Sequence, residues 1–483
     1  MKYAPGMLAR AGVGAALWQG LAFAAGKILV FVTVVVLARL LSPEEYGLVA
    51  LALVLMAYAE TIADAGVAQA LVYLPHTEVI ARSALLLSVS LGVLCASGAI
   101  LAAPAIAAVF NQPDTAPLVV VLAGSLLATS FAAVPEALMR RDLLFKRLTP
   151  APVARAVVTA TVTLILAFAG LGAWSLAIGT TAGSVCYAVV CWLLLPGHAP
   201  WQIWRVRKDA LRANLKFGAP VAGSSLLARL IFDIDYVIIA VVLGAHALGY
   251  YTLAFRLPEM VIINVFFVFS TVMFPLYSQV RGEPDRLREG YLKSVQLQSL
   301  YGVTAGVGLA VIAPVLVPVL FGAQWRDAVL PLVFLSLYAA ARSLGAGTND
   351  VYKALGRPGL SIVLSLLRLG ILVPVLVYAA QWGIVGVAAA QLIVALFFSC
   401  FMQLLAAKVT ALTVRQLSRA LVPGLVCGLA VAVAGLGIFA LPLLGGPATI
   451  LVVVVAGVLV VEVSMRLWFP SLRRELLQLV RRR

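Results

Sequence analysis

The sequence predicts an all-α polytopic membrane protein with about fourteen transmembrane helices. The first observation is composition: 63% of the residues are hydrophobic and only 11% are charged. The mean hydropathy is +1.08. The second observation is that apolar runs of roughly 17 to 25 residues recur along the chain, each long enough to cross a bilayer as a helix. None shows the ten-residue alternation that is typical of a barrel strand.

The apolar runs form three groups. The first six expected helices cover 16–38, 46–72, 83–109, 117–139, 151–170 and 173–195. The next six cover 217–243, 248–276, 295–321, 328–348, 359–380 and 384–407. A last pair covers 419–441 and 447–469. The first run has a second interpretation as a signal peptide cut near "AFAA" (22–25), but Gln19 interrupts it and it continues to Leu41, which favours a helix.

Basic residues gather on one side of the predicted membrane domain. Loops after even-numbered helices contain 19 Lys or Arg and the two tails contain seven, whereas loops after odd-numbered helices contain only Arg39 and Arg326. The positive-inside rule therefore predicts that both termini are cytoplasmic. Most of the net charge of +16 is then an orientation signal with some attraction to anionic membrane lipids, and nucleic acid is not expected as a partner.

Cysteine and histidine do not suggest a site. The five cysteines lie in apolar runs without CxxC spacing, and the three histidines are scattered over loops, so neither a metal site nor a cofactor is predicted. The chain has no phosphate-binding loop, nucleophile elbow or HExxH motif, so we expect no catalytic residue and no enzyme. A membrane-embedded glycan polymerase or ligase stays as the alternative of another class, although outer loops of about two to seven residues leave it little room.

Internal repetition is the next signal. The stretch "VLARLLSPEEYGLVALAL" (36–53) matches "IIAVVLGAHALGYYTLAF" (238–255) at an offset of 202 residues. Two further matches occur in the same order at an offset of 210, "APAIAAVF" (103–110) with "APVLVPVLF" (313–321) and "GAWSLAIG" (172–179) with "WGIVGVAA" (382–389). Because each half has an even number of helices, the halves share one orientation, and a site between them is expected.

The repeat divides the chain into five predicted parts. The segment 200–216 is expected to be a basic cytoplasmic linker, either an amphipathic interfacial segment or a plain loop. The parts are an N-lobe (1–199), the linker (200–216), a C-lobe (217–407), two extra helices (408–470) and a basic cytoplasmic tail (471–483).

Several stretches resemble a known family. They are "ARLLSPEEYGLVALAL" (38–53), "DAGVAQALV" (64–72), "PEALMRRDLLFKRL" (135–148) and the long segment 215–257. Together they resemble the polysaccharide transporter (Wzx/WzxC-like) family of the multidrug/oligosaccharidyl-lipid/polysaccharide (MOP) superfamily. The resemblance implies V-shaped lobes, a bacterial inner-membrane location and export of undecaprenyl-pyrophosphate-linked oligosaccharide for lipopolysaccharide, capsule or exopolysaccharide synthesis, with polysaccharide polymerase or export machinery as further partners. A MATE-like drug or cation antiporter of the same superfamily is the alternative, and the net charge of the cavity would discriminate the two.

Charged residues inside predicted helices are the candidate site residues, because such residues normally face a bundle interior or a watery cavity. The predicted substrate-binding cations are Lys27, Arg229, Arg256, Arg342 and Arg368. Lys27 and Arg229 are equivalent at the repeat offset of 202, so we expect them to face each other and clamp a diphosphate. For Arg342 and Arg368, anchoring near the cytoplasmic ends of their helices is the alternative.

The acidic residues are predicted to pair with these cations or to couple transport to an ion gradient. Asp233 lies four residues after Arg229 and is its expected partner, whereas Asp235 is rotated by about 200° and must pair elsewhere. Glu259 and Arg256 form an expected i, i+3 pair.

Two further acids share a face of one predicted helix. Glu60 and Asp64 suit proton coupling. The alternatives are a pair with Lys27 or a position near the aqueous end of the helix.

Overall fold

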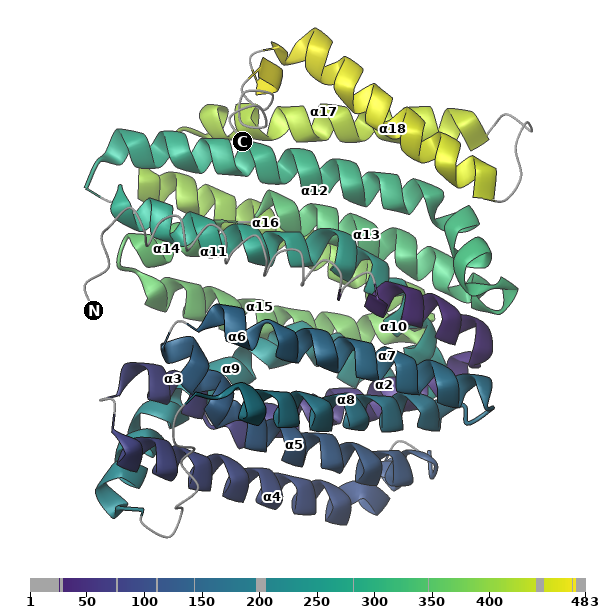
Figure 1. Ribbon diagram of the computed structural model, residues 1–483. Coiled ribbons are helices and arrows are strands. Elements are labelled where there is room, and N and C mark those ends of the chain that lie inside the picture. Colours follow the sequence, from purple (N-terminus) through teal and green to yellow (C-terminus); the bar gives the residue numbers. More distant parts are fainter. Residues whose placement is uncertain are drawn as a thin grey trace. The chain divides into compact units, whose positions relative to one another are not determined.

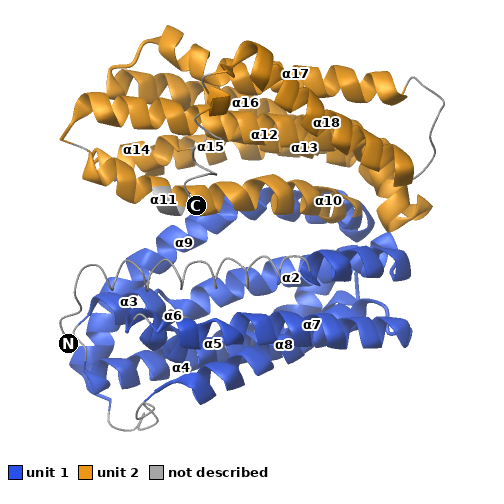
Figure 2. Ribbon diagram, turned by 45° about the horizontal axis from the view of Figure 1, so that its top comes forward, with its two compact units in different colours: residues 1–249 blue, residues 250–483 orange. Residues whose placement is uncertain are grey.

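The computed structural model describes residue 26 and residues 29–74, 77–109, 112–142, 144–196, 206–280, 282–345, 347–439, 447–470 and 472–474. All regular elements in these ranges are helices, as the sequence predicts (Figure 1). The chain divides into two compact units, residues 1–249 and 250–483, coloured blue and orange in Figure 2. The predicted lobe and linker boundaries stay a prediction.

Unit 1 is a bundle of helices that begins with residues 29–40. The helices that follow are α2 (Pro43–Asp64), α3 (Val67–Tyr73), α4 (Glu78–Val109), α5 (Thr115–Arg141), α6 (Phe145–Leu148), α7 (Pro150–Phe168), α8 (Ala173–Leu194), α9 (Lys208–Val242) and the start of α10 (Gly244–Pro258). The helix α9 begins inside the segment predicted as a linker, because its first turns are polar and do not extend the apolar run. It packs against α2, α3 and α4.

Unit 2 contains the rest of α10 and the remaining helices. They are the π-helical turn η2 (Glu259–Ile263), α11 (Asn264–Gln279), α12 (Pro284–Phe321), η3 (Ala323–Ala328), α13 (Val329–Leu344), α14 (Thr348–Ala354), α15 (Pro358–Ala379), η4 (Ala380–Trp382), α16 (Gly383–Thr410), α17 (Val414–Phe439) and α18 (Pro447–Trp468). Among them, α12 packs against α13 and α17, and α13 packs against α16.

Eleven segments of the described residues are long and apolar enough to span a membrane. The longest, Gly359–Thr410, contains two helices, α15 and α16, joined by η4. The helix α9 is not among the eleven and has three charged residues in its apolar half. The first predicted helix, 16–38, lies mostly outside the described residues. These three facts account for the difference from the predicted fourteen.

The start of α2 shows why the helix begins at Pro43. The Ser42 hydroxyl accepts a hydrogen bond from the backbone N–H of Glu45, and the Glu45 carboxylate accepts one from the backbone N–H of Ser42. This capping box satisfies two N–H groups that a helix start would leave open, and Pro43 has no N–H to satisfy.

Two glycines let the starts of α2 and α10 cross closely within unit 1. A Cβ on Gly47 would lie 1.8 Å from the Ala245 carbonyl oxygen, and a Cβ on Gly249 would lie 1.9 Å from the Pro43 carbonyl oxygen. Gly47 and Gly249 are equivalent at the repeat offset of 202, and so are Pro43 and Ala245. The contact is therefore symmetric: Gly47 meets Ala245, and their repeat partners Gly249 and Pro43 meet in the same way. This symmetry supports the repeat inferred from sequence.

The C-terminal end of α2 is set by a break in the helix. At Ala65 and Gly66 the backbone is left-handed, with φ of 44° and 68°, so α2 stops and α3 begins. A Cβ on Gly66 would lie 2.4 Å from the Gly218 carbonyl oxygen, so α9 packs directly on this break. The break leaves Asp64 as the last residue of α2.

Candidate functional site

A polar cavity of about 450 Å³ lies within unit 1. Helices α2, α3, α5, α7, α8 and α9 contribute side chains to its wall. This volume falls in the range of pockets that bind small ligands or headgroups. Three of the predicted site residues line it, namely Glu60, Asp64 and Arg229. Hydroxyl groups of Thr61, Thr129, Ser130 and Ser225 also belong to its wall.

Two of the three arginines in the pocket wall are paired with carboxylates. Arg229 forms an ion pair with Asp233 at 2.9 Å, as their spacing predicts. Arg140 forms an ion pair with Glu136 at 2.5 Å. Both are i, i+4 pairs on single helices, and both are partly open to solvent, so each contributes little to stability by itself.

The third arginine, Arg155, lies over an aromatic ring. Its guanidinium carbon lies 5.6 Å from the centroid of the Tyr187 ring, a cation–π distance. The Tyr187 hydroxyl is hydrogen-bonded to the Glu136 carboxylate. Side chains from α5, α7 and α8 therefore form one connected network on this side of the pocket.

Glycines on α8 bring Arg155 and Tyr187 together. A Cβ on Gly183 would lie 3.0 Å from the Arg155 carbonyl oxygen and 1.9 Å from the Thr159 hydroxyl. The backbone of α7 therefore approaches α8 as closely as only glycine allows. Tyr187 lies one helical turn after Gly183, so its ring reaches the guanidinium.

The two acidic residues of α2 in the pocket wall, Asp64 and Glu60, differ in their bonding partners. The Asp64 carboxylate accepts hydrogen bonds from the backbone N–H groups of Gly66 and Ala68, which caps the start of α3. Glu60 lies one turn earlier on α2 and is exposed. Within the described residues neither forms an ion pair with a basic side chain.

The wall of the pocket contains equal numbers of acids and bases. Three arginines (Arg140, Arg155 and Arg229) face three carboxylates (Glu60, Asp64 and Glu136). The cationic excess that the sequence interpretation used to separate a polysaccharide exporter from a drug antiporter is therefore not found in this pocket.

Asp235 lies outside the pocket wall. It is only 2% exposed, and its carboxylate accepts a hydrogen bond from the backbone N–H of Tyr236. The hydroxyl of Tyr58, on α2, lies within electrostatic range of both Asp233 and Asp235. The two acids are thus buried to different degrees, as their rotation around the helix predicts.

The other predicted cations lie in unit 2 or outside the described residues. Arg256 pairs with Glu259 at 3.1 Å, where α10 continues into the π-helical turn. Arg342 donates a hydrogen bond to the Tyr338 hydroxyl at 3.0 Å. Arg368 lies on α15. Lys27 is outside the described residues, so its expected position opposite Arg229 stays a prediction.

The four residues of the network around Arg155 were not among the predicted site residues. Arg155 and Glu136 could have been found, because both are charged residues inside apolar runs. Arg140 could only be read as a topology signal in a basic loop. Tyr187 has no signal in the sequence, since a tyrosine in an apolar run is ordinary.

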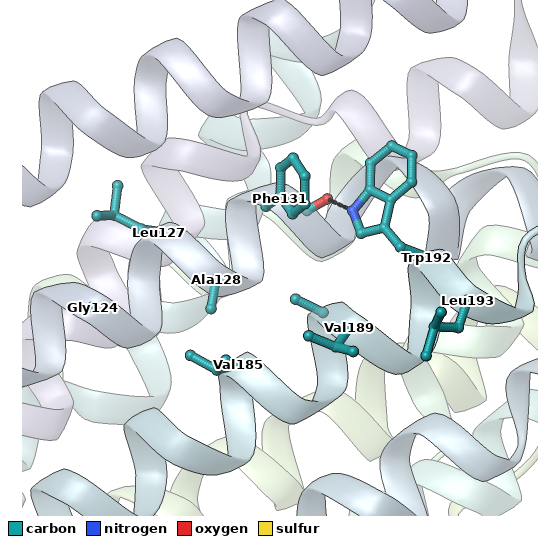
Figure 3. A pocket seen from close by; sticks show the side chains of 9 residues that line it. Gly124, Leu127, Ala128, Phe131, Val185, Val189, Trp192 and Leu193 are labelled. Carbon is teal, nitrogen blue, oxygen red and sulfur yellow. Dashed lines mark hydrogen bonds between the residues drawn. The ribbon is translucent and has the colours of Figure 1, made fainter. Parts of the chain in front are cut away.

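A second cavity, of about 520 Å³, is an apolar groove between α5 and α8 (Figure 3). The indole N–H of Trp192 donates a hydrogen bond to the Phe131 carbonyl oxygen at 3.0 Å. The usual i+4 donor for that carbonyl is missing, because the residue four positions later is Pro135, which has no N–H. Trp192 thus closes a gap in the backbone of α5.

No cluster of three or more metal-ligating side chains occurs in the described part of the chain. The wall of the pocket presents guanidinium, hydroxyl and carboxylate groups. Such groups suit phosphate and sugar hydroxyls.

Comparisons with known proteins agree with this fold. Residues 36–330 match the family described as "Polysaccharide biosynthesis protein". WzxC of Escherichia coli (strain K12), a lipopolysaccharide biosynthesis protein, is 26% identical over 395 residues, which are 79% of this chain and 78% of WzxC. ExoT of Rhizobium meliloti (strain 1021), a succinoglycan biosynthesis transport protein, is 27% identical over 312 residues, 63% of this chain and 62% of ExoT.

Among solved structures, the lipid II flippase MurJ in an inward closed conformation is similar, with a TM-score of 0.74 and 13% identity. The likeness covers 94% of this chain and 99% of MurJ, and at that identity it shows a shared fold. Because the family match covers more than half of the residues, this multi-pass membrane protein belongs to the family described as "Polysaccharide biosynthesis protein".

Proposed function

We propose that this protein is a flippase that moves an undecaprenyl-pyrophosphate-linked oligosaccharide from the inner to the outer leaflet of a bacterial cytoplasmic membrane. The oligosaccharide then enters the synthesis of a surface polysaccharide such as O-antigen, capsule or exopolysaccharide. The observation that carries the proposal is the polar pocket of unit 1, which combines arginines with hydroxyl groups in a chain of apolar spans.

The chemistry of the pocket matches the two polar parts of such a substrate. Arginine binds phosphate oxygens through paired N–H groups. Carboxylates and hydroxyls bind sugar hydroxyls, and the wall provides Glu60, Asp64, Thr61 and Thr129. A pocket of about 450 Å³ accommodates a headgroup rather than a long polymer, so a single lipid-linked unit is the expected cargo.

Transport requires the pocket to open first to one side of the membrane and then to the other. We propose that an ion gradient drives this change, with Glu60 and Asp64 as the coupling groups. Asp64 lies where α2 breaks, so a change in its charge would act directly on the bonds to Gly66 and Ala68 that start α3. Both termini are proposed to be cytoplasmic, as the distribution of basic loops predicts.

The equal numbers of acids and bases in the pocket keep a drug or cation antiporter of the same superfamily as the second candidate. Carboxylates attract organic cations, and an arginine without an acidic partner attracts anions. The two candidates therefore differ in which charged residue matters: loss of Glu60 would abolish binding of a cationic drug, whereas it would not remove the main contact to a diphosphate.

The test uses cells depleted of the protein. Lipid extracts are analysed by mass spectrometry for saccharides linked to a polyprenyl diphosphate. We expect one such intermediate to accumulate, and to stay protected from a membrane-impermeant glycosidase applied to the outer face. If no intermediate accumulates and the cells instead become sensitive to cationic drugs, the flippase proposal is wrong and the antiporter takes its place.

A further inference from the structure

Arg155 differs from the other two arginines in the pocket wall. Arg140 is paired with Glu136, and Arg229 is paired with Asp233. Within the described residues, no carboxylate lies within 4 Å of the Arg155 guanidinium, whose recorded partner is the ring of Tyr187. This half-buried cation therefore lacks a neutralising partner in the described structure.

A charged side chain without a counter-charge in a membrane span raises the free energy of the folded protein unless an anion binds to it. A guanidinium keeps its charge at any pH that a cell experiences, so Arg155 cannot escape by losing its proton. A charged side chain in a membrane span normally pairs with an opposite charge or faces a watery cavity. Arg155 belongs to the span Lys146–Phe168 and opens into the polar pocket.

We propose that Arg155 binds the phosphate oxygens of a diphosphate ester in this pocket, and that Tyr187 is the positioning residue that holds its guanidinium in place. The proposal rests on the proposed function and assigns its diphosphate to a particular side chain. The predicted clamp of Lys27 and Arg229 is a different pair of residues, and Arg229 is already partly neutralised by Asp233.

The geometry suits this role. The guanidinium carbon of Arg155 lies 5.6 Å from the centroid of the Tyr187 ring, and within the described residues no carboxylate forms an ion pair with its N–H groups. A planar guanidinium presents paired N–H donors that match two phosphate oxygens. Tyr187 is held in turn by its hydrogen bond to Glu136, and Glu136 by Arg140, so the ring beneath Arg155 has little freedom to move.

The experiment measures binding of farnesyl diphosphate to the full chain in lipid nanodiscs. Inorganic pyrophosphate is the second probe, because a free phosphate and a lipid headgroup offer the same oxygens. We expect Arg155→Gln to raise the Kd for farnesyl diphosphate at least about tenfold, as the loss of a charge-assisted pair of hydrogen bonds implies. Arg155→Lys keeps the charge but loses the paired donors, so its Kd for farnesyl diphosphate should lie between those of the wild type and Arg155→Gln.

The matched control is Arg286→Gln, which removes an exposed arginine from the start of α12 and should leave the Kd unchanged. Each variant is first checked for an unchanged thermal unfolding midpoint. If Arg155→Gln does not fold, Arg155→Lys and the two tyrosine variants below carry the test. Weaker binding of farnesyl diphosphate but not of pyrophosphate would assign the site to the lipid-linked headgroup, and an equal loss for both would assign it to diphosphate alone.

Tyrosine variants separate positioning from a general structural role. Tyr187→Phe keeps the ring but loses the hydroxyl that bonds to Glu136, so binding should weaken only slightly. Tyr187→Leu removes the ring, so it should weaken binding several-fold and more than Tyr187→Phe does. If Arg155→Gln and Tyr187→Leu both bind like the wild type, the inference is wrong while the flippase proposal stands. If the wild type itself binds neither probe, the diphosphate recognition assumed in the proposed function fails as well.

Discussion

The crossing of α2 and α10 at Gly47 and Gly249 provides a sharp test of the fold. In Gly47→Ala the new methyl group would lie 1.8 Å from the Ala245 carbonyl oxygen, whereas real contacts essentially never fall below 3.0 Å. The two helix starts must therefore move apart by about 1.2 Å, the difference between these two distances. The obstacle is backbone, so no side chain can rotate out of the way.

Overpacking of this kind typically costs about 1 to 3 kcal/mol, and we expect a value near the upper end because the obstacle is rigid. Gly249→Ala should cost a similar amount, since its methyl group meets the Pro43 carbonyl oxygen at 1.9 Å. The double variant should cost less than the two singles added together, because the first substitution already separates the helices. That shortfall is the signature of a shared contact.

The assay is thermal unfolding in one detergent at one scan rate, because membrane proteins often unfold irreversibly and their midpoints depend on the rate. Gly98→Ala on α4 is the matched control, since a Cβ there would meet nothing within 4 Å. Its midpoint should equal or slightly exceed that of the wild type. If Gly47→Ala unfolds at the same temperature as Gly98→Ala, or if the two substitutions at the crossing are fully additive, the close symmetric contact is wrong.

Two further predictions concern single interactions in unit 1. Arg229→Asp or Asp233→Arg alone places two like charges one helical turn apart, whereas the double exchange restores an ion pair. The unfolding midpoint of the double exchange should therefore recover from the single variants, by a small amount because the pair is partly open to solvent, while export of polysaccharide stays lost. Recovery of export would show a purely structural pair. Trp192→Phe should lower stability by about 1 kcal/mol, because the Phe131 carbonyl loses its donor. In a Pro135→Ala background the helix supplies its own N–H, so the same substitution should cost clearly less; an equal cost in both backgrounds would contradict this explanation.

Much of the fold follows from the sequence, because membrane spans leave a strong signal. A lipid environment requires each backbone polar group to be satisfied within its own helix, so apolar runs predict helices directly. The runs 83–109 and 173–195 correspond closely to α4 (Glu78–Val109) and α8 (Ala173–Leu194). The early starts of α9 and α12 were missed, because their first turns are polar and hydropathy measures only what lies in lipid.

The site was less predictable, because its parts come from separate helices. Local pairs such as Arg229 and Asp233 follow from helical spacing. The contact of Arg155 with Tyr187 depends on the packing of α7 against α8 at Gly183, and spacing within one helix says nothing about it. Asp64, predicted as a charged residue in an apolar run, lines the polar pocket. Its bonds to the backbone at Gly66 and Ala68 required knowledge that α2 breaks there.

The most direct test of the central claim is a flipping assay with the purified full chain in liposomes that contain a lipid-linked oligosaccharide isolated from depleted cells. A membrane-impermeant glycosidase reports the fraction that is exposed on the outer leaflet. We predict that the protected inner fraction becomes accessible over time only in liposomes that contain the protein, faster with an imposed ion gradient, and much more slowly with Arg155→Gln. An inner fraction that stays protected in the presence of the wild-type protein and a gradient would contradict the account.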